Sequence, residues 1–505
     1  MRASAVDRVL VFGFIVILAV IKTGTVLETD VFWQVREGQE LLSGAALERA
    51  DTWSWAPIPG VFVPNSPAWA WIVGGAWQLA GSWGLWIVTS LYVSACLVLA
   101  VLVARWLGAR WIPLTVAFLA AAVCSMPLVS ARSSIGSVAL LMLATWFGVW
   151  LGSGAPARPV VRDGLVLLGV GFALSFAGNW WHASWASLAA VTALAWALAW
   201  LLLPGIGIRR GLAYLVSGTV GLAVGEVLGP LGVTGWTRSS DVLAICRGLV
   251  TEWSGPFVPG HVFWYGIPVI LLLAGTALVL GLMARRWWRH KHLNPRDTLT
   301  VLLTGQAFAF ALGGLIAIRF IWFAAFLFMP VVARALTRGM GTATEAPAGT
   351  SRLRGAIRER TSDGYWRVIL GLLLVVLVPV GVYKALPHAY PTTDQAIAAL
   401  PRDCHLFSTD ADANAVLLLR PDVKVWIDGR TDMWGRPRLV EALDRFAGRG
   451  TPGLVPEGTT CILLPASGSG DTAETDGLVA GLEQSPDWTV ASRAGASVVW
   501  VPAAR

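Results

Sequence analysis

Long apolar stretches, each close to the length of a membrane-spanning helix, constrain this chain more than any other feature. A helix needs about 20 apolar residues to cross the hydrocarbon core of a bilayer. Eleven stretches predict such helices, and we expect a polytopic α-helical membrane protein. They cover residues 9–27, 84–104, 111–129, 135–151, 163–179, 184–203, 211–228, 263–283, 298–317, 320–335 and 367–383.

Composition agrees with a membrane protein and excludes two other classes. Of the 505 residues, 56% are hydrophobic and 13% are charged, whereas a soluble domain contains about 25% charged residues. Disordered chains are poor in large apolar residues, so disorder is excluded as well. The 28 Trp residues suit the membrane–water interface, where one end of the indole is apolar and the other is hydrated.

Two apolar segments need a separate interpretation. The stretch 67–80 is too short to cross the membrane, and it predicts a re-entrant or interfacial helix. The first span follows Arg2 and Arg8, as a signal peptide would, but Glu28-Thr29-Asp30 ends it without a small-residue cleavage site. We therefore expect the first span to remain as an anchor.

The distribution of basic residues predicts the orientation, because Lys and Arg favour cytoplasmic connections. With the N-terminus inside, the predicted cytoplasmic connections hold 20 Lys and Arg residues and the predicted outer connections hold 6. We expect a multi-pass plasma-membrane protein whose C-terminal region is extracytoplasmic. The net charge of +8 is then explained by the basic residues of the cytoplasmic connections. No nucleic-acid partner is therefore expected.

One predicted cytoplasmic connection, residues 334–367, contains seven of these arginines. Its Gly, Thr and Ala residues are typical of a flexible basic loop. Anionic lipid of the inner leaflet attracts such segments, so membrane lipids are expected partners.

Near residue 384, long apolar runs give way to short alternating segments. This change predicts two domains, 1–383 in the membrane and 384–505 outside it. Short β-rich runs at 404–408, 423–427, 461–465 and 497–501 alternate with helical patterns at 411–419, 437–447 and 475–484. This alternation predicts a small α/β domain. Cys404 and Cys461 each begin a predicted strand, and outside the cytoplasm they are expected to form a disulfide.

Polar residues gather at the predicted outer ends of the spans. Ionisable groups at membrane depth are costly, so each warrants a functional hypothesis. The first outer loop, residues 28–83, is especially rich in them, and together the set predicts one polar cavity at the outer surface. The residues are Glu28, Asp30, Arg36, Asp51, Asn65, Arg132, Asn179, His182, Glu252 and Arg319.

Within this set, carboxylates and cations have different expected roles. Glu28 and Asp30 offer a general base for a hydroxyl; the alternative is that they solvate a helix end. No metal-ligand spacing occurs, although two carboxylates could also bind a divalent cation. Arg132, His182 and Arg319 suit a phosphate, or else they anchor helix ends at the interface.

Together these groups fit transfer of a sugar from a lipid-linked phosphate. An acceptor hydroxyl, deprotonated by Asp30 or Glu28, would attack the anomeric carbon. The cations would stabilise the charge that develops on the leaving phosphate.

Several motifs resemble a large bacterial family of polytopic glycosyltransferases of the GT-C class, distantly similar to protein O-mannosyltransferases. The matching stretches are ETDVFWQVREG at 28–38 with RADTWS at 49–54, Arg132, Gly178-Asn179-x-x-His182, Glu252-Trp253, Arg319, and VKVWIDGRTDMWG at 423–435. The resemblance covers nearly the whole chain. It implies a GT-C fold, a polyprenyl-phosphate sugar as donor, an acceptor in the cell envelope, and Asp30 as the first-loop acid.

The chain departs from that pattern at two places. Gln34 stands where a His is usual, and Asn65-Ser-Pro-Ala-Trp69 stands where Asn-His-Glu-Trp is usual. These departures favour the alternative of a non-catalytic GT-C-like protein that binds a lipid-linked glycan or an envelope partner. A transporter or flippase is the third alternative, but it calls for polar groups through the whole depth of the membrane.

The Asp428-Gly429-Arg430-Thr431-Asp432 segment follows a predicted strand, so we expect it in a turn at the strand end. One interpretation is that it contacts the acceptor glycan or closes over the membrane cavity. The other is that Asp428 and Arg430 pair to hold the turn.

Overall fold

The structure is a computed structural model that describes residues 5–23, 29–58, 60–124, 128–155, 158–232, 234–342, 352–385, 393–449, 453–466, 475–494 and 497–504. It divides into two compact units, each built from separate stretches of the chain. The unit called here the helical unit comprises Met1–Thr23, Thr89–Ser239 and Val250–Ala385. The sheet unit comprises Gly24–Val88, Ser240–Leu249 and Leu386–Arg505.

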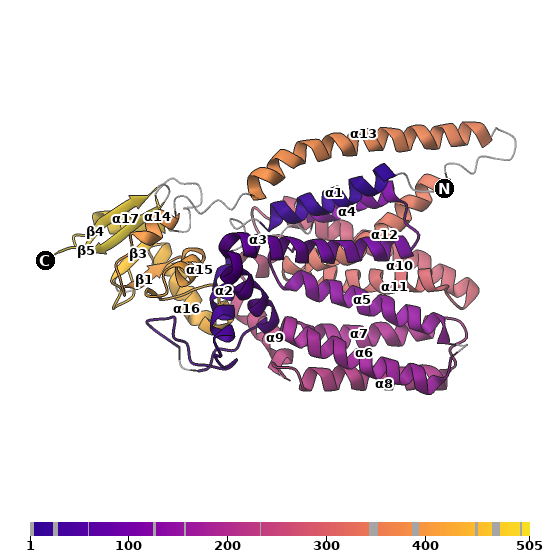
Figure 1. Ribbon diagram of the computed structural model, residues 1–505, viewed down its shortest axis with the longest axis horizontal. Helices are drawn as coiled ribbons and strands as arrows, with labels where there is room; N and C mark the ends of the chain where they lie inside the picture. Colours follow the sequence, from indigo (N-terminus) through magenta and orange to yellow (C-terminus); the bar gives the residue numbers. More distant parts are fainter. Residues whose placement is uncertain are drawn as a thin grey trace. The chain divides into compact units, whose positions relative to one another are not determined.

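Every predicted span coincides with a helix (Figure 1). Inside a bilayer, a single apolar run of this length can hydrogen-bond all its backbone polar groups internally only as a helix. The helices are α1 (Ala5–Lys22), α3 (Pro67–Trp106), α4 (Trp111–Cys124), α5 (Ser134–Ser153), α6 (Val160–Trp181), α7 (Trp185–Leu202), α8 (Ile208–Val227), α10 (Ile267–His290), α11 (Pro295–Gly313), α12 (Arg319–Thr342) and α13 (Arg352–Ala385).

Seven helices in the described part of the chain are long and apolar enough to cross a membrane. They lie in α3, α5, α6, α7, α10, α12 and α13, so this is a multi-pass membrane protein. Helix α4 is apolar but shorter. Whether α1, α4, α8 and α11 also cross, as the count of eleven requires, stays a prediction.

The predicted break between the short apolar stretch and the second span is present. Helix α3 is interrupted at Ala80 (φ −151°, ψ 25°) and Gly81 (φ 53°, ψ −137°). The positive φ of Gly81 is a conformation that side chains with a Cβ rarely adopt. A separate helix therefore precedes residue 81, and its re-entrant or interfacial placement stays a prediction.

The basic connection is shorter than the sequence predicts. Helix α12 continues to Thr342 and α13 begins at Arg352, so most of the segment 334–367 is helical instead of a flexible loop. Arg334 is buried and pairs with Asp297 of α11 at 2.5 Å. Arg367 pairs with Asp7 of α1 at 2.6 Å. These two internal ion pairs give part of the basic charge a structural partner, which the sequence pattern did not indicate.

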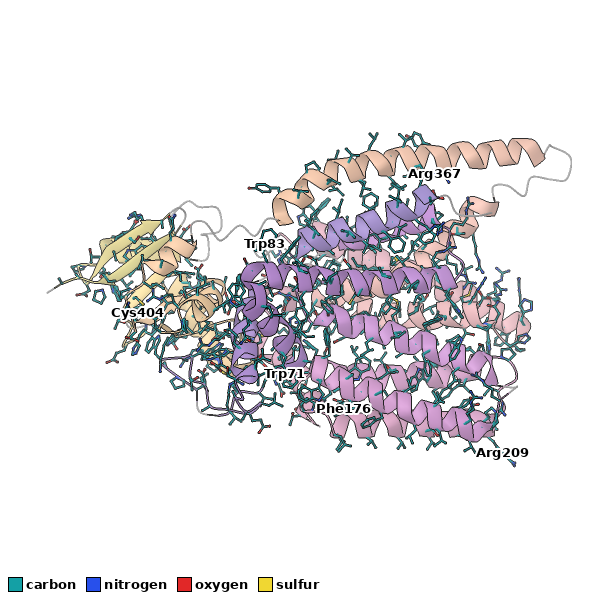
Figure 2. All side chains as sticks on the ribbon, viewed as in Figure 1. Trp71, Trp83, Phe176, Arg209, Arg367 and Cys404 are labelled. Atoms are coloured by element: carbon teal, nitrogen blue, oxygen red, sulfur yellow. A yellow bond between two sulfur atoms is a disulfide. The ribbon has the colours of Figure 1, made fainter. Side chains whose placement is uncertain are left out.

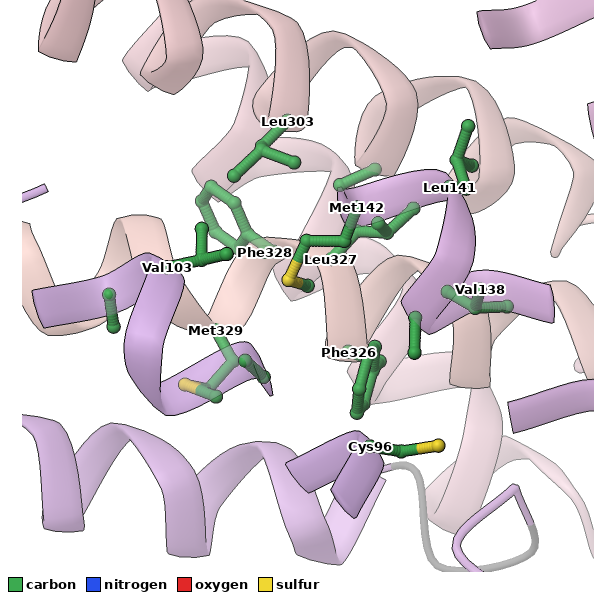
Figure 3. Packing of buried hydrophobic residues seen from close by; sticks show 14 of the residues in the cluster. Cys96, Val103, Val138, Leu141, Met142, Leu303, Phe326, Leu327, Phe328 and Met329 are labelled. Carbon is green, nitrogen blue, oxygen red and sulfur yellow. The ribbon is translucent and has the colours of Figure 1, made fainter. Parts of the chain in front are cut away.

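An apolar cluster fills the interior of the helical unit, and Figure 3 shows the part of it to which α3, α5, α11 and α12 contribute. Leu141 and Met142 of α5, Leu303 of α11 and Leu327 of α12 are all fully buried in this cluster. Close packing of this kind resists volume changes of even one methylene group. The cluster fixes the helices whose ends carry the candidate site.

The sheet unit contains a five-stranded mixed sheet of order β2-β1-β3-β5-β4. Its strands are β1 (His405–Ser408), β2 (Lys424–Val425), β3 (Cys461–Pro465), β4 (Trp488–Ala494) and β5 (Ser497–Pro502). Strands β2, β1 and β3 are parallel, whereas β5 pairs antiparallel with β3 and β4. The helices of this part are α14 (Thr393–Ala398), α15 (Asp410–Leu419), α16 (Thr431–Phe446) and α17 (Asp476–Gln484).

The first predicted outer loop joins this sheet. Val425 of β2 donates to the carbonyl of Trp53 at 3.0 Å, and Trp55 donates to the carbonyl of Val425 at 3.2 Å. The Trp55 indole also stacks on His405 of β1, with ring centroids 5.1 Å apart. Residues 53–55 therefore protect the exposed edge of the sheet. The same loop carries helix α2 (Asp30–Leu42), whose first residue is the predicted base.

Candidate functional site

The predicted site residues fall into two clusters, one in each unit. Arg132, Asn179, His182, Glu252 and Arg319 belong to the helical unit. The sheet unit contains the remaining described residues of the set, namely Asp30, Arg36, Asp51, Asn65, Asp428, Arg430 and Asp432. Glu28 lies outside the described residues.

In the helical unit, one carboxylate holds two guanidinium groups. Arg132 Nη1 donates to Glu252 Oε2 at 2.5 Å, and Arg319 Nη1 donates to Glu252 Oε1 at 3.1 Å. The three side chains keep between 16% and 24% of their surface exposed. Arg319 also lies over the ring of Trp253, 5.0 Å from its centroid. This arrangement carries a net charge of one positive unit at a partly open surface.

The fold holds this triad through its backbone. The Tyr92 hydroxyl donates to the carbonyl of Ser133, next to Arg132, at 3.0 Å. Ile318, which precedes Arg319, donates its backbone N–H to the carbonyl of Ser254 at 3.0 Å. The short helix η2 (Thr251–Trp253) is thereby tied to the start of α12. The two arginines are therefore set by the start of helices and not by flexible loops.

The electrostatics of Glu252 follow from its neighbours. Burial by itself raises the pKa of Glu252, but Arg319 and Arg132 outweigh burial and hold that pKa below its usual value. Glu252 is therefore ionised at neutral pH. The sequence placed Glu252 in the polar set but did not indicate that it bridges both arginines, which are 120 and 67 residues away from it.

His182 follows α6 and is neutral, in contrast to the cationic role expected from the sequence. The backbone N–H of Ser184 donates to His182 Nδ1 at 3.0 Å, and the Ser184 hydroxyl lies 2.7 Å from the same nitrogen. Nδ1 therefore accepts, and Nε2 carries the proton. Burial, together with the charges of Arg319 and Arg238, lowers the pKa of His182 to about 3. His182 can offer a ligand a hydrogen bond from Nε2 but no charge.

Asn179 is engaged in the helix packing. Its amide donates to Glu226 Oε1 of α8 at 2.7 Å, and its Oδ1 accepts from the backbone N–H of Leu231 at 2.8 Å. Both Asn179 and Glu226 are buried. From the sequence, Asn179 could bind substrate or be structural, and this geometry favours the structural role. Glu226 was absent from the predicted set, since it lies inside an apolar stretch.

In the sheet unit, Asp30 lies against the Asp428-Gly429-Arg430 turn. A Cβ placed on Gly429 would lie 2.7 Å from Asp30 Oδ1 and 2.6 Å from Asn414 Nδ2. Gly429 N–H donates to Asn414 Oδ1 at 2.8 Å. Only glycine permits this close approach of the Asp30 carboxylate, the turn and Asn414. Asn414 is buried on α15 and was not singled out from the sequence.

The turn is held by a buried group of charges. Arg430 donates to both carboxylate oxygens of Asp428, the shortest bond being 2.6 Å, and to Asp51 Oδ1 at 3.1 Å. Its guanidinium stacks on Trp53, 4.2 Å from the ring centroid. Burial alone lowers the pKa of Arg430, but Asp428 and Asp51 raise it above its usual value. The interpretation of Asp428 and Arg430 as a structural pair agrees with this geometry, and Asp51 joins them.

The other predicted residues of this unit have separate positions. Arg36 pairs with Glu40 one turn along α2 at 3.1 Å. Asn65 lies just before α3, and Asp432 lies in the first turn of α16. Cys404 and Cys461 form a disulfide. Among the residues that the structure describes, no three His, Cys, Asp or Glu side chains are grouped in a way that would hold a metal ion.

Gln34, one of the two departures from the motifs that the chain resembles, contacts the tryptophan that ends the other altered element. Gln34 Oε1 accepts a hydrogen bond from the indole Nε1 of Trp69 at 2.8 Å, and both side chains are buried. Gln34 stands at the position of the usual His, and Trp69 ends the altered Asn65–Trp69 element. The replacement therefore belongs to the packing of α2 against the start of α3.

Comparison with known proteins adds a likeness of overall structure. No protein-family model matches the sequence, and no curated protein matches it either. The structure is similar to the crystal structure of ArnT from Cupriavidus metallidurans bound to undecaprenyl phosphate, with a TM-score of 0.48. The two chains are 13% identical, and the alignment covers 98% of each.

Proposed function

We propose that this protein is a membrane glycosyltransferase of the GT-C class. It would transfer a sugar from a polyprenyl-phosphate donor to an acceptor in the cell envelope, outside the cytoplasm. The observation that carries the proposal is the Arg132–Glu252–Arg319 triad, in which one carboxylate holds two partly exposed guanidinium groups. The motif resemblance and the multi-pass architecture support the same class.

The triad suits a phosphate diester better than a simple helix-end anchor. Two arginines that only anchored helix ends would not need to share a carboxylate. Glu252 fixes the orientation of both guanidinium groups, and their side chains stay partly exposed, as binding to phosphate oxygens requires. Because one positive charge remains, the triad can balance one negative phosphate. His182 Nε2, which carries a proton, adds an uncharged donor in the same unit.

Asp30 is the proposed general base. Its carboxylate lies at the start of α2 beside Gly429 and Asn414, two residues that a helix-end solvation role does not require. In the reaction, the acceptor hydroxyl gives its proton to Asp30, and its oxygen forms a bond to the anomeric carbon. The bond from that carbon to the lipid phosphate breaks, and its electron pair leaves with the phosphate. The arginines stabilise this charge as it develops.

The buried Gln34–Trp69 pair bears on the non-catalytic alternative. That alternative rests on the His that Gln34 replaces and on the His and Glu that are missing from the Asn65–Trp69 element. Because Gln34 is buried and bonded to Trp69, the change is accommodated within the core of the unit. The transfer assay described below separates the catalytic role of Asp30 from the non-catalytic alternative.

A transfer assay tests this proposal directly. Membranes containing the protein are supplied with radiolabelled polyprenyl-phosphate sugars, and label is followed into the envelope glycan, lipid and protein fractions. We expect transfer that falls by about tenfold or more for each of Arg132→Gln and Arg319→Gln, because each removes charge-assisted bonds to phosphate. Arg449→Gln is the matched control, since this residue is largely exposed in the sheet unit. Donor binding without transfer by the intact protein would support the non-catalytic alternative instead.

A further inference from the structure

A polar cavity lies in the helical unit, among residues that the proposed reaction does not use. Its volume is ≈ 660 Å³. Helices α3, α5 and α12 end around it, and α11 begins there. The side chains that matter for its chemistry are two tryptophans, three arginines and a threonine, namely Trp106, Trp150, Arg296, Arg334, Arg338 and Thr337.

The charge at this cavity is strongly unbalanced. Asp297 is fully buried and receives three guanidinium groups, from Arg334 at 2.5 Å, Arg286 at 3.1 Å and Arg338 at 3.6 Å. Asn294 also donates to this carboxylate, at 2.7 Å. Asp297 is thus saturated with donors, and three arginines share one negative charge. An anion that enters the cavity completes this balance, whereas a neutral ligand does not.

The arginines divide into a fixed group and an available group. Arg334 is buried and donates to Asp297, to Thr300 Oγ1 and to the carbonyl of Arg296. Arg338 keeps 52% of its side chain exposed. Arg296 is also exposed, and its Nη1 lies 3.5 Å from the position that a Cβ on Gly108 would occupy. Arg296 and Arg338 can therefore turn toward a ligand without breaking the core.

Two tryptophans indicate the level of the membrane at which the cavity lies. Trp106 is the last residue of α3, and Trp150 lies near the end of α5 with 49% of its surface exposed. Tryptophan prefers the boundary between acyl chains and headgroups. The distribution of basic residues predicts that this end of the helices is cytoplasmic. A ligand here would meet arginines at the level where lipid phosphates lie.

We propose that this cavity binds the phosphate-bearing headgroup of an anionic phospholipid. Arg296 and Arg338 would bind the phosphate oxygens, as guanidinium groups do in bidentate fashion. Trp106 and Trp150 would contact the glycerol and the first acyl carbons. Basic pockets between transmembrane helices on the cytoplasmic side bind anionic headgroups in this way. The site is independent of the proposed transferase reaction.

Lipid binding to the purified full-length protein in a non-ionic detergent tests the proposal. Phosphatidylglycerol, phosphatidylcholine and inorganic phosphate are titrated separately, and bound molecules are counted by native mass spectrometry. We expect one phosphatidylglycerol per chain at the tight site. Phosphatidylcholine and inorganic phosphate should each bind at least tenfold more weakly, because the first lacks net charge and the second lacks the acyl contacts.

Variants locate the bound lipid. Arg296→Gln and Arg338→Gln should each weaken phosphatidylglycerol binding about fivefold, the factor that corresponds to one arginine near a lipid surface. Arg209→Gln is the control, because this exposed arginine at the start of α8 (Figure 2) does not line the cavity. If both cavity variants bind phosphatidylglycerol as tightly as the control does, the site is elsewhere. Equal binding of phosphatidylcholine or of inorganic phosphate would also overturn the proposal.

Discussion

The indole of Trp69 donates a hydrogen bond to the side-chain oxygen of Gln34 at 2.8 Å, inside the sheet unit. Because both side chains are buried, removing one partner leaves the other without a replacement from water. Burying an unsatisfied polar group costs about 1–3 kcal/mol. The bond therefore contributes to stability at a position where this chain differs from the motifs that it otherwise resembles.

Gln34→Ala should lower the free energy of unfolding by about 1–3 kcal/mol, while transfer activity per folded molecule persists. Gln39→Ala, on a less buried part of α2, is the control and should change stability by less than about 0.5 kcal/mol. Denaturant unfolding in detergent measures both. An unchanged stability in Gln34→Ala would show that the Trp69 bond contributes little.

Arg430 should be among the most sensitive positions of the sheet unit. Arg430→Met leaves the buried carboxylates of Asp428 and Asp51 without their cation, which costs about 3–5 kcal/mol. Arg449→Met is matched to it, since the exposed pair of Arg449 with Asp444 contributes at most about 1 kcal/mol. Thermal unfolding of the two variants should differ clearly. Similar midpoints would contradict the structural role of the Asp428–Arg430 pair.

His182 should make stability depend on pH. Its pKa in the folded protein is about 3, below the value of about 6.5 in an unfolded chain. Below about pH 6.5 the unfolded state therefore binds a proton that the folded state does not. The free energy of unfolding should fall with pH by up to about 1.4 kcal/mol per pH unit.

The variant His182→Asn removes the imidazole that binds this proton in the unfolded state, and it keeps an acceptor for Ser184. Its stability should fall less steeply between neutral and acidic pH than that of the unaltered protein. His290→Asn, at the exposed end of α10, should leave the slope unchanged. If His182→Asn has the same slope as the unaltered protein, another group is responsible for the pH dependence.

The disulfide between Cys404 and Cys461 should stabilise the sheet unit. The bond closes a loop with a sequence separation of 57 residues, and a loop of this size corresponds to about 4 kcal/mol of unfolding free energy. Cys404→Ala with Cys461→Ala should lower stability by an amount of this order. Mass analysis with and without reductant checks the bond itself, and two free thiols in protein taken from the membrane would exclude it.

Local patterns predicted much of the fold. Long apolar runs predicted the eleven helices that coincide with the expected spans, and β-rich runs predicted β1, β2, β3 and β5, whereas α2 was not predicted. Strand β4 (Trp488–Ala494) was not predicted, because it is only partly apolar and most of its residues are exposed. The end of α12 was placed too early, because the pairing of Arg334 with Asp297 is a contact between distant residues. Hydrophobic pattern carries no information on such contacts.

The candidate site was predicted in its residue types but not in its connections. Arg132, Glu252 and Arg319 were each expected at the outer ends of helices, yet their shared ion pair depends on chain segments far apart in sequence. The same is true of Asp51 and Arg430, which are separated by 379 residues. Asn414 carried no signal, since an amide on an amphipathic helix is usually a surface residue.

Asp30 is the proposed general base, and a single substitution at this residue tests that role. Asp30→Asn keeps the size of the side chain beside Gly429 but removes the base. Asp476→Asn is the matched control, because Asp476 is likewise the first residue of its helix. Transfer from a labelled polyprenyl-phosphate sugar is measured for both variants at equal amounts of folded, membrane-inserted protein. We expect a loss of at least about 100-fold for Asp30→Asn and full activity for the control. Full activity of Asp30→Asn would contradict the assignment of Asp30 as the base.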